Sequence, residues 1–84
     1  MVIEKYQITV RLNTPREVTE FCQTTSTYPM HISIVAQHDI FTVSARSILG
    51  MYSLNLSEPV TITFSTSKLL DTAKIDRDFQ KFIV

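Results

Sequence analysis

Glycine is scarce in this sequence, which has one, Gly50, among 84 residues. Phosphate-binding loops and dinucleotide fingerprints need several glycines at fixed spacing, because the backbone must approach the phosphate closely. The usual nucleotide sites are therefore excluded. The single cysteine, Cys22, cannot form an internal disulfide. No Ser-His-Asp order and no metal-ligand spacing stands out, so we expect no catalytic site, no metal and no cofactor.

An excess of charge of one sign is also missing. Eight Lys and Arg residues balance eight Asp and Glu residues, so no positive field is available to hold a phosphate backbone, and we expect no nucleic-acid partner. The sequence has no apolar run of about 18 residues and no signal-like amino terminus. These absences predict a cytoplasmic protein that does not enter a membrane. A chain this short has room for one core, which predicts one domain over residues 1–84.

What the sequence does contain is an ordered series of strand and helix patterns. Apolar and polar residues alternate over residues 2–12, 30–37, 41–45 and 60–65, the period of half-buried strands. Helical spacing occupies residues 15–28, 47–54 and about 68–82. The order β-α-β-β-α-β-α predicts an α+β open-faced β-sandwich, a four-stranded antiparallel sheet with three helices on one face.

The first helix has the clearest start signal. Thr14 is suited to the N-cap, Pro15 to the first helical position, and Glu17 completes a capping box. The stripe that should face the sheet is Val18, Phe21, Cys22, Thr25 and Tyr28, and Pro29 ends the helix. For the last helix, the predicted buried stripe is Leu69, Thr72, Ile75, Phe79 and Phe82.

The second helix carries a family resemblance. Residues 46–54 read Arg-Ser-Ile-Leu-Gly-Met-Tyr-Ser-Leu. This run resembles the second-helix motif of HPr, the small phosphocarrier of the bacterial phosphoenolpyruvate-dependent sugar phosphotransferase system, in which a basic residue, Ser-Ile-Met-Gly and Met-Ser-Leu recur. HPr proteins share the βαββαβα order, so the resemblance implies the HPr fold over nearly the whole chain.

The loop before the first helix departs from the HPr pattern. In HPr it reads Gly-(Ile/Leu)-His-(Ala/Thr)-Arg-Pro-Ala, and the histidine carries the phosphoryl group. Here residues 12–18 read Leu-Asn-Thr-Pro-Arg-Glu-Val, so aligning at Arg16 places Thr14 at the histidine and Glu17 at the proline. A threonine hydroxyl without an adjacent base is a poor nucleophile. Arg16 matches the arginine that accompanies the phosphohistidine, or is a solvated side chain of the first turn.

Ser47 matches a serine with a regulatory role. In HPr of Gram-positive bacteria, a dedicated HPr kinase phosphorylates the equivalent serine, and the product acts in carbon catabolite repression. The resemblance implies the same modification at Ser47, with Arg46 beside a phosphate at the helix N-terminus. The alternative is that Ser47 is simply an N-cap.

The same helix is where HPr proteins present an apolar patch to their protein partners. The resemblance therefore implies partner contacts by Ile48, Leu49 and Met51. A short helix cannot bury all of its apolar residues in one direction. We expect Leu49, together with Ile48, to face solvent, and Met51 and Leu54 to point at the sheet.

These observations predict a non-enzymatic, HPr-like protein related to the phosphotransferase system that acts by binding and regulation. HPr kinase or a transcription regulator is the expected partner. One alternative is an active phosphocarrier that uses a displaced histidine, His31 or His38. Another is a small-ligand-binding regulatory domain of the ferredoxin-like or amino-acid-binding kind, because such domains share much of this element order.

Overall fold

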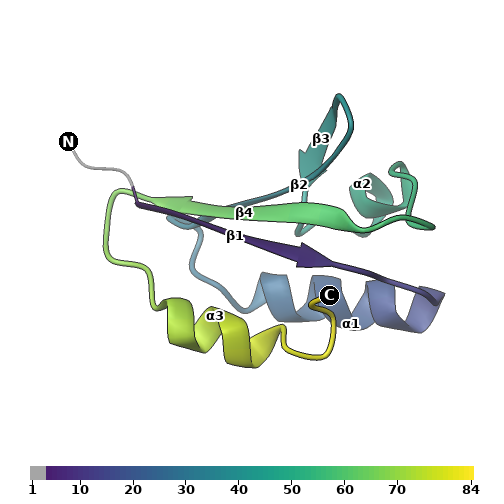
Figure 1. The fold of residues 1–84 in the computed structure, drawn as a ribbon. Helices are drawn as coiled ribbons and strands as arrows, with labels where there is room; N and C mark the ends of the chain where they lie inside the picture. Colours follow the sequence, from purple (N-terminus) through teal and green to yellow (C-terminus); the bar gives the residue numbers. More distant parts are fainter. Residues whose placement is uncertain (1–3) are drawn as a thin grey trace.

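Four antiparallel strands form one sheet in the order β1-β4-β2-β3 (Figure 1). The structure is a computed structural model and describes residues 4–84. Its elements are β1 Glu4–Val10, α1 Pro15–Ser26, β2 Ser33–His38, β3 Phe41–Ser44, α2 Ile48–Tyr52, β4 Val60–Thr66 and α3 Thr72–Asp78. The predicted βαββαβα order and α+β open-faced sandwich are confirmed. Val2, which the alternation placed in the first strand, lies outside the described residues.

The helices give the sheet one covered face and one open face. In Figure 1, α1 and α3 lie side by side against the sheet, whereas α2 lies at one end, where it contacts α1 and β3. The central strand β4 shows why the sheet has two unlike faces. Its residues alternate between buried Val60, Ile62 and Phe64 and partly exposed threonine and serine, the pattern expected of a strand with one solvated face.

Aromatic rings fill the space between the sheet and the two long helices. The five rings come from α1, the loop after it, β4 and the segment after α3, and neighbouring centroids lie 5.4 to 5.9 Å apart. Such tilted and edge-on arrangements are the favourable ones for aromatic pairs. The members of this cluster are Phe21, Tyr28, Phe64, Phe79 and Phe82. The stripe predicted for the first helix is buried throughout.

The last helix begins later than its stripe predicted. It starts at Thr72 because the carboxylate of Asp71 accepts a hydrogen bond from the Lys74 N–H at 3.0 Å and caps the helix. Leu69, placed in the buried stripe, is exposed in the preceding loop, and Thr72 is exposed too. The loop is fixed instead by the Leu70 N–H, which donates to Glu4 at 3.0 Å.

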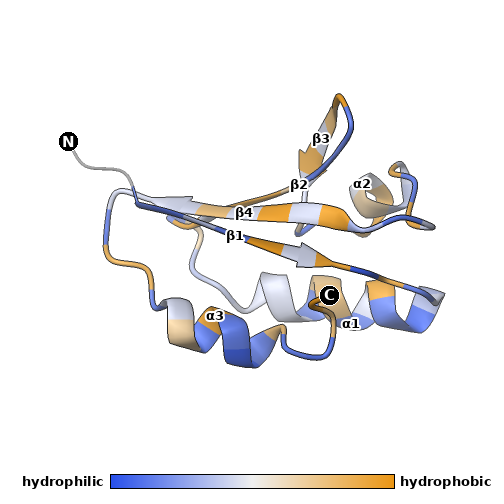
Figure 2. Cartoon of the chain, in the orientation of Figure 1, coloured by the Kyte–Doolittle hydropathy of each residue, from blue (hydrophilic) through white to orange (hydrophobic). Residues whose placement is uncertain are grey.

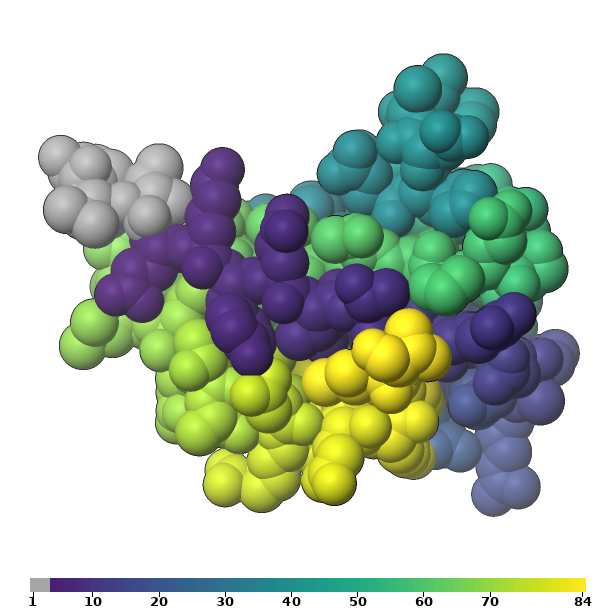
Figure 3. Space-filling model, in the orientation of Figure 1, coloured from purple at the N-terminus to yellow at the C-terminus, as the bar shows by residue number. Residues whose placement is uncertain are grey.

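The carboxyl-terminal segment covers the outer edge of β1. The Arg11 N–H donates to the Phe82 carbonyl at 2.9 Å, and the Val84 N–H donates to the Thr9 carbonyl at 3.1 Å. Figure 3 shows this yellow segment lying against the purple strand. Exposed strand edges invite pairing with other chains, and this part of the edge is occupied by the chain itself.

The β2–β3 hairpin projects beyond the covered part of the sheet (Figures 1 and 2). Phe41, which the alternation placed on the buried face, is therefore exposed at the tip. Met30, also placed on the buried face, is exposed because it lies in the loop before β2 and not in the strand. The tip turns through Asp39, whose φ of 59° lies in the left-handed region. Alternation predicted the two strands, but it does not reveal where the helix layer stops covering them.

A partly buried hydrogen bond between Tyr28 and Asp78 makes stability depend on pH. The Tyr28 hydroxyl donates to Asp78 at 2.8 Å, and the Lys74 ammonium donates to the same carboxylate at 2.6 Å. Lys74, with Tyr28 second, holds the pKa of Asp78 below its ordinary value. Burial, aided by Asp78, raises the pKa of Tyr28.

We expect stability to fall at both ends of the pH scale. A lowered carboxyl pKa stabilises the fold above the unfolded value of about 3.9, and that contribution is lost as pH falls through the folded pKa. A raised phenol pKa stabilises the fold below about 10, and that contribution is lost as pH rises further. Urea midpoints measured across pH test both. Asp78→Asn should weaken the acid dependence but not remove it, because Lys81 also lowers the pKa of Glu20. An unchanged acid limb would contradict this assignment.

Among residues 4–84, no helix combines the length and the apolar character that crossing a bilayer requires.

Candidate functional site

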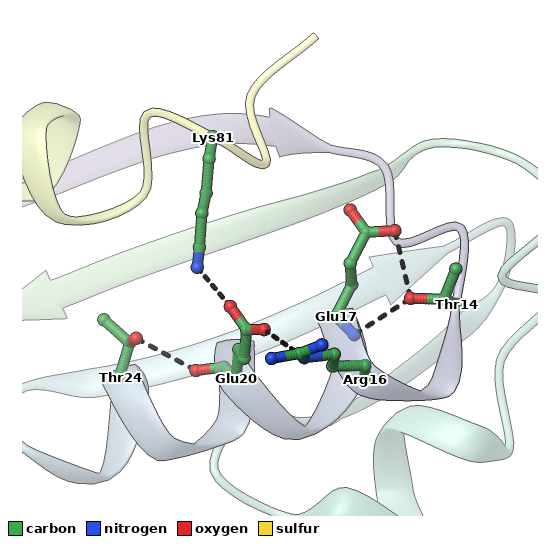
Figure 4. A network of polar contacts seen from close by, with 6 residues as sticks. All are labelled: Thr14, Arg16, Glu17, Glu20, Thr24 and Lys81. Carbon is green, nitrogen blue, oxygen red and sulfur yellow. Dashed lines mark hydrogen bonds and ion pairs between the residues drawn. The ribbon is translucent and has the colours of Figure 1, made fainter.

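The N-terminus of α1 is closed by its own side chains (Figure 4). The Thr14 hydroxyl accepts a hydrogen bond from the Glu17 N–H at 3.2 Å. The Glu17 carboxylate in turn accepts from the Asn13 N–H at 3.1 Å and from the Thr14 hydroxyl at 3.3 Å. The first of these bonds is half of the predicted capping box, whereas the carboxylate accepts from the N–H of Asn13, one residue before the N-cap. The Glu17 N–H, a donor that a bound anion could use at this helix N-terminus, is thus satisfied by the Thr14 hydroxyl.

Arg16 points along the helix rather than over its N-terminus. Its guanidinium lies 3.4 Å from the Glu20 carboxylate, and its side chain is 90% exposed. Lys81 forms a second ion pair with Glu20, reaching across from the carboxyl-terminal segment (Figure 4). Lys81 is the main reason that the pKa of Glu20 is lowered. An exposed pair of this kind contributes little to stability, and Arg16 remains a solvated side chain of the first turn.

Neither histidine lies at the N-terminus of α1. His31 is exposed in the loop that leads into β2. His38 ends β2, and its Nε2 lies 3.8 Å from a carboxylate oxygen of Glu58. No cluster of three or more His, Cys, Asp or Glu side chains suited to a metal ion occurs over residues 4–84.

A shallow, mostly apolar depression separates the start of α1 from the loop after α2. Its volume is about 350 Å³. The residues that line it are Leu12, Asn13, Thr14, Pro15, Val18, Tyr52, Leu54, Leu56 and Ser57. Such a surface can receive an apolar side chain. Thr14, at the start of α1, and Tyr52, in α2, both border this depression.

Helix α2 has Ser47 as its N-cap and presents three apolar residues to solvent. The Ser47 hydroxyl accepts a hydrogen bond from the Gly50 N–H at 3.0 Å. Leu49 is 81% exposed, with Tyr52 and Ile48 partly exposed at 47% and 38%. We call Ile48, Leu49 and Tyr52 the α2 surface. The predicted exposure of Leu49 and Ile48 is confirmed.

Met51 does not belong to this surface. Its side chain is completely buried, so the sequence-based assignment of Met51 to partner contacts needs correction. Tyr52 belongs to the exposed surface instead. It was not predicted as a partner contact, although its spacing from Ile48 and Leu49 indicates the same helix face. Tyr52 lies four residues after Ile48 and three after Leu49, which puts all three on one face of a helix.

Arg46 also differs from its predicted role beside a phosphate on Ser47. Its guanidinium donates four hydrogen bonds of 2.8 Å to backbone carbonyls at the end of α1 and in the loop that follows. The acceptors are the carbonyls of Thr25, Tyr28, Pro29 and Ile32. The planar fork of an arginine suits such a cluster of acceptors. The Arg46 guanidinium is therefore hydrogen bonded to the chain's own backbone and is not available as the predicted partner of a phosphate on Ser47.

Comparison with solved structures supplies the relation to known proteins. The phosphocarrier protein HPr from Bacillus anthracis str. Ames aligns over the full length of both chains, with a TM-score of 0.63 and 22% sequence identity. HPr-C-His from Thermoanaerobacter tengcongensis aligns over 99% of this chain and 91% of its own, with a TM-score of 0.59 and 24% identity. The chain has the HPr fold. At these identities the likeness is one of fold.

Among the comparisons, the likeness to HPr comes from structure alone. No protein-family model matches the sequence, and no curated protein matches it. The two features that sequence analysis compared with HPr nevertheless lie close together. The depression described above is bordered by Thr14 and by Tyr52 of α2, so the first-helix loop and the second helix form one continuous surface.

Proposed function

We propose that this chain is a non-enzymatic, HPr-like binding domain of 84 residues, related to the phosphotransferase system and working in the cytoplasm. The observation that carries the proposal is the carboxylate at the start of α1. Thr14 and Glu17 occupy the capping box there, in the loop where the HPr pattern has its phosphorylated histidine. The domain would act by binding proteins rather than by carrying a phosphoryl group.

Chemistry at the α1 N-terminus supports this proposal. Reversible transfer needs a group that attacks phosphorus at neutral pH and leaves again readily, as an imidazole does. The Thr14 hydroxyl donates to the Glu17 carboxylate, so a base is adjacent, but the phosphate ester of a threonine is too stable to pass its phosphoryl group on. The negative charge of Glu17 also repels an incoming phosphate at short range. Both effects oppose a phosphoryl group at this position.

The α2 surface is the proposed contact with the partner. Residues 47–57 contain no charged side chain, and they carry the exposed Ile48, Leu49 and Tyr52. The centre of a protein interface is typically rich in aromatic and aliphatic side chains and poor in charged ones. The depression beside Tyr52 extends the apolar area toward α1. An HPr kinase or a transcription regulator would meet this face of the domain.

Ser47 is the proposed site of regulatory phosphorylation. Ser47 is exposed. Among the described hydrogen bonds, its hydroxyl oxygen takes part in one, as the acceptor of the Gly50 N–H. A phosphate ester keeps acceptor oxygens at this position and adds negative charge at the start of the helix, which is favourable there. Arg46 is occupied elsewhere, so the phosphate would stay accessible to a partner.

Two phosphorylation reactions followed by intact mass test the proposal. With phosphoenolpyruvate and the general phosphotransferase enzyme, we expect no added phosphate, whereas an authentic HPr in the same tube is labelled. With HPr kinase and ATP, we expect one phosphate, absent in Ser47→Ala. Stoichiometric transfer from phosphoenolpyruvate would overturn the non-carrier role, and its loss in His31→Ala or His38→Ala would identify the displaced acceptor. No labelling by the kinase would leave Ser47 as an N-cap.

A further inference from the structure

We infer that Arg46 is a positioning residue for the α2 surface, which it holds in place by tying the start of α2 to the end of α1. The inference extends the proposed function, since it explains how the proposed binding surface keeps its shape. It rests on the hydrogen bonds around Arg46 and on the small size of α2.

Two sets of hydrogen bonds connect the residues before α2 to the end of α1 and the loop after it. On one side, the Arg46 guanidinium donates to four carbonyls of residues 25–32. On the other, the completely buried Thr25 donates its hydroxyl hydrogen to the Ala45 carbonyl at 2.8 Å. Residues 45 and 46 are therefore fixed to the last turn of α1 and the loop after it. Ser47, the N-cap of α2, follows immediately.

Helix α2 has little else to hold it. It is five residues long, and helices of that length do not persist in water without tertiary support. Met51 and Leu54 are its buried anchors at the far end. At the near end, the polar contacts of Arg46 fix where Ser47 begins the helix. The direction in which Ile48 and Leu49 face solvent depends on that starting point.

Loss of these contacts should release α2 before it releases the sheet. Hydrogen bonds from charged donors are stronger than neutral ones, and all four from Arg46 join the residue just before the N-cap of α2 to the end of α1 and the loop after it. The central strand β4 is held by β1 and β2 through independent ladders. A role confined to global stability would affect both regions equally. A positioning role affects α2 more.

Native-state amide hydrogen exchange measured by NMR on the free protein separates these cases. The reporters are the α2-region amides of Gly50, Met51 and Ser53, which are hydrogen bonded within that region, against Ile62 in the centre of β4. In Arg46→Met, we expect exchange at the α2 amides to accelerate about tenfold or more relative to the acceleration at Ile62. Arg46→Lys, which keeps the charge but loses the planar fork, should give a smaller effect in the same direction.

The matched control is Arg16→Met, because Arg16 is an exposed arginine paired only with Glu20. It should leave the ratio unchanged. Equal acceleration at α2 and β4 in Arg46→Met, or protection like that of the wild type in both Arg46 variants, would overturn the inference. If Arg46→Met does not fold, Arg46→Lys decides by the same ratio. No partner or kinase is needed, so this result is independent of the phosphorylation reactions above.

Discussion

Replacing Phe79 with alanine should lower the free energy of unfolding by about 3–5 kcal/mol, the usual cost of removing a large buried aromatic side chain. Phe79 is completely buried at the centre of the aromatic cluster. Its ring lies 5.4 Å from that of Phe21, 5.5 Å from that of Phe64 and 5.8 Å from that of Tyr28. One side chain thus joins α1, the loop after it, β4 and the segment after α3, and its removal leaves a cavity bordered by three other rings.

Urea denaturation followed by circular dichroism measures this loss, and Phe41→Ala is its control. Phe41 undergoes the same chemical change at a position that is 61% exposed, so its cost should stay within about 0.5 kcal/mol. A loss of several kcal/mol is a large fraction of the stability of a small domain. Phe79→Leu, which leaves a smaller cavity, therefore provides a milder variant with a measurable transition. Similar midpoints for Phe79→Ala and Phe41→Ala would contradict the packing described here.

Much of this fold could be predicted because its local signals agree with its tertiary contacts. The capping box of Thr14 and Glu17 gave the start of α1, since those hydrogen bonds involve only neighbouring residues. The alternation over residues 60–65 predicted a strand, and β4 is one, paired with β1 on one side and β2 on the other. Where propensity, period and capping point to the same element, the sequence is sufficient.

The errors occur where distant parts of the chain decide the outcome. Leu69 continues a helical spacing, but Asp71 caps the helix and Glu4, far away in the sequence, holds the preceding turn. Phe41 continues the alternation of β3 onto the projecting hairpin, and Met30 continues that of β2 into the loop before the strand, and both are exposed. Periodicity identifies the face of a strand, but the extent of its burial depends on packing.

The candidate site was predictable only where local spacing in the sequence decides which side chains are exposed. Helical spacing is enough to place Leu49 on the outside of α2, and exposure at that position is observed. The role of Arg46 could not be read from its neighbours in sequence, because its four acceptors lie 14 to 21 residues away. Adjacency to Ser47 suggested a phosphate ligand, whereas the folded chain places the guanidinium against carbonyls.

Met51→Ala and Leu49→Ala should separate the support of the α2 surface from the surface itself. Met51 is fully buried, and its truncation should cost about 2–4 kcal/mol through lost packing and the cavity that remains. Leu49 is 81% exposed, so the same truncation should change the stability of the fold by no more than about 0.5 kcal/mol. Urea titrations of the two variants beside the wild type give both values.

Binding should show the opposite ranking once stability is taken into account. Leu49→Ala removes the most exposed apolar side chain of the α2 surface, so a folded variant should bind the partner more weakly. In a competition against HPr for HPr kinase, for example, we expect Leu49→Ala to compete less well than the wild type. Met51→Ala should compete normally at temperatures where it remains folded. Normal competition by Leu49→Ala, together with unchanged stability, would move the proposed interface away from α2.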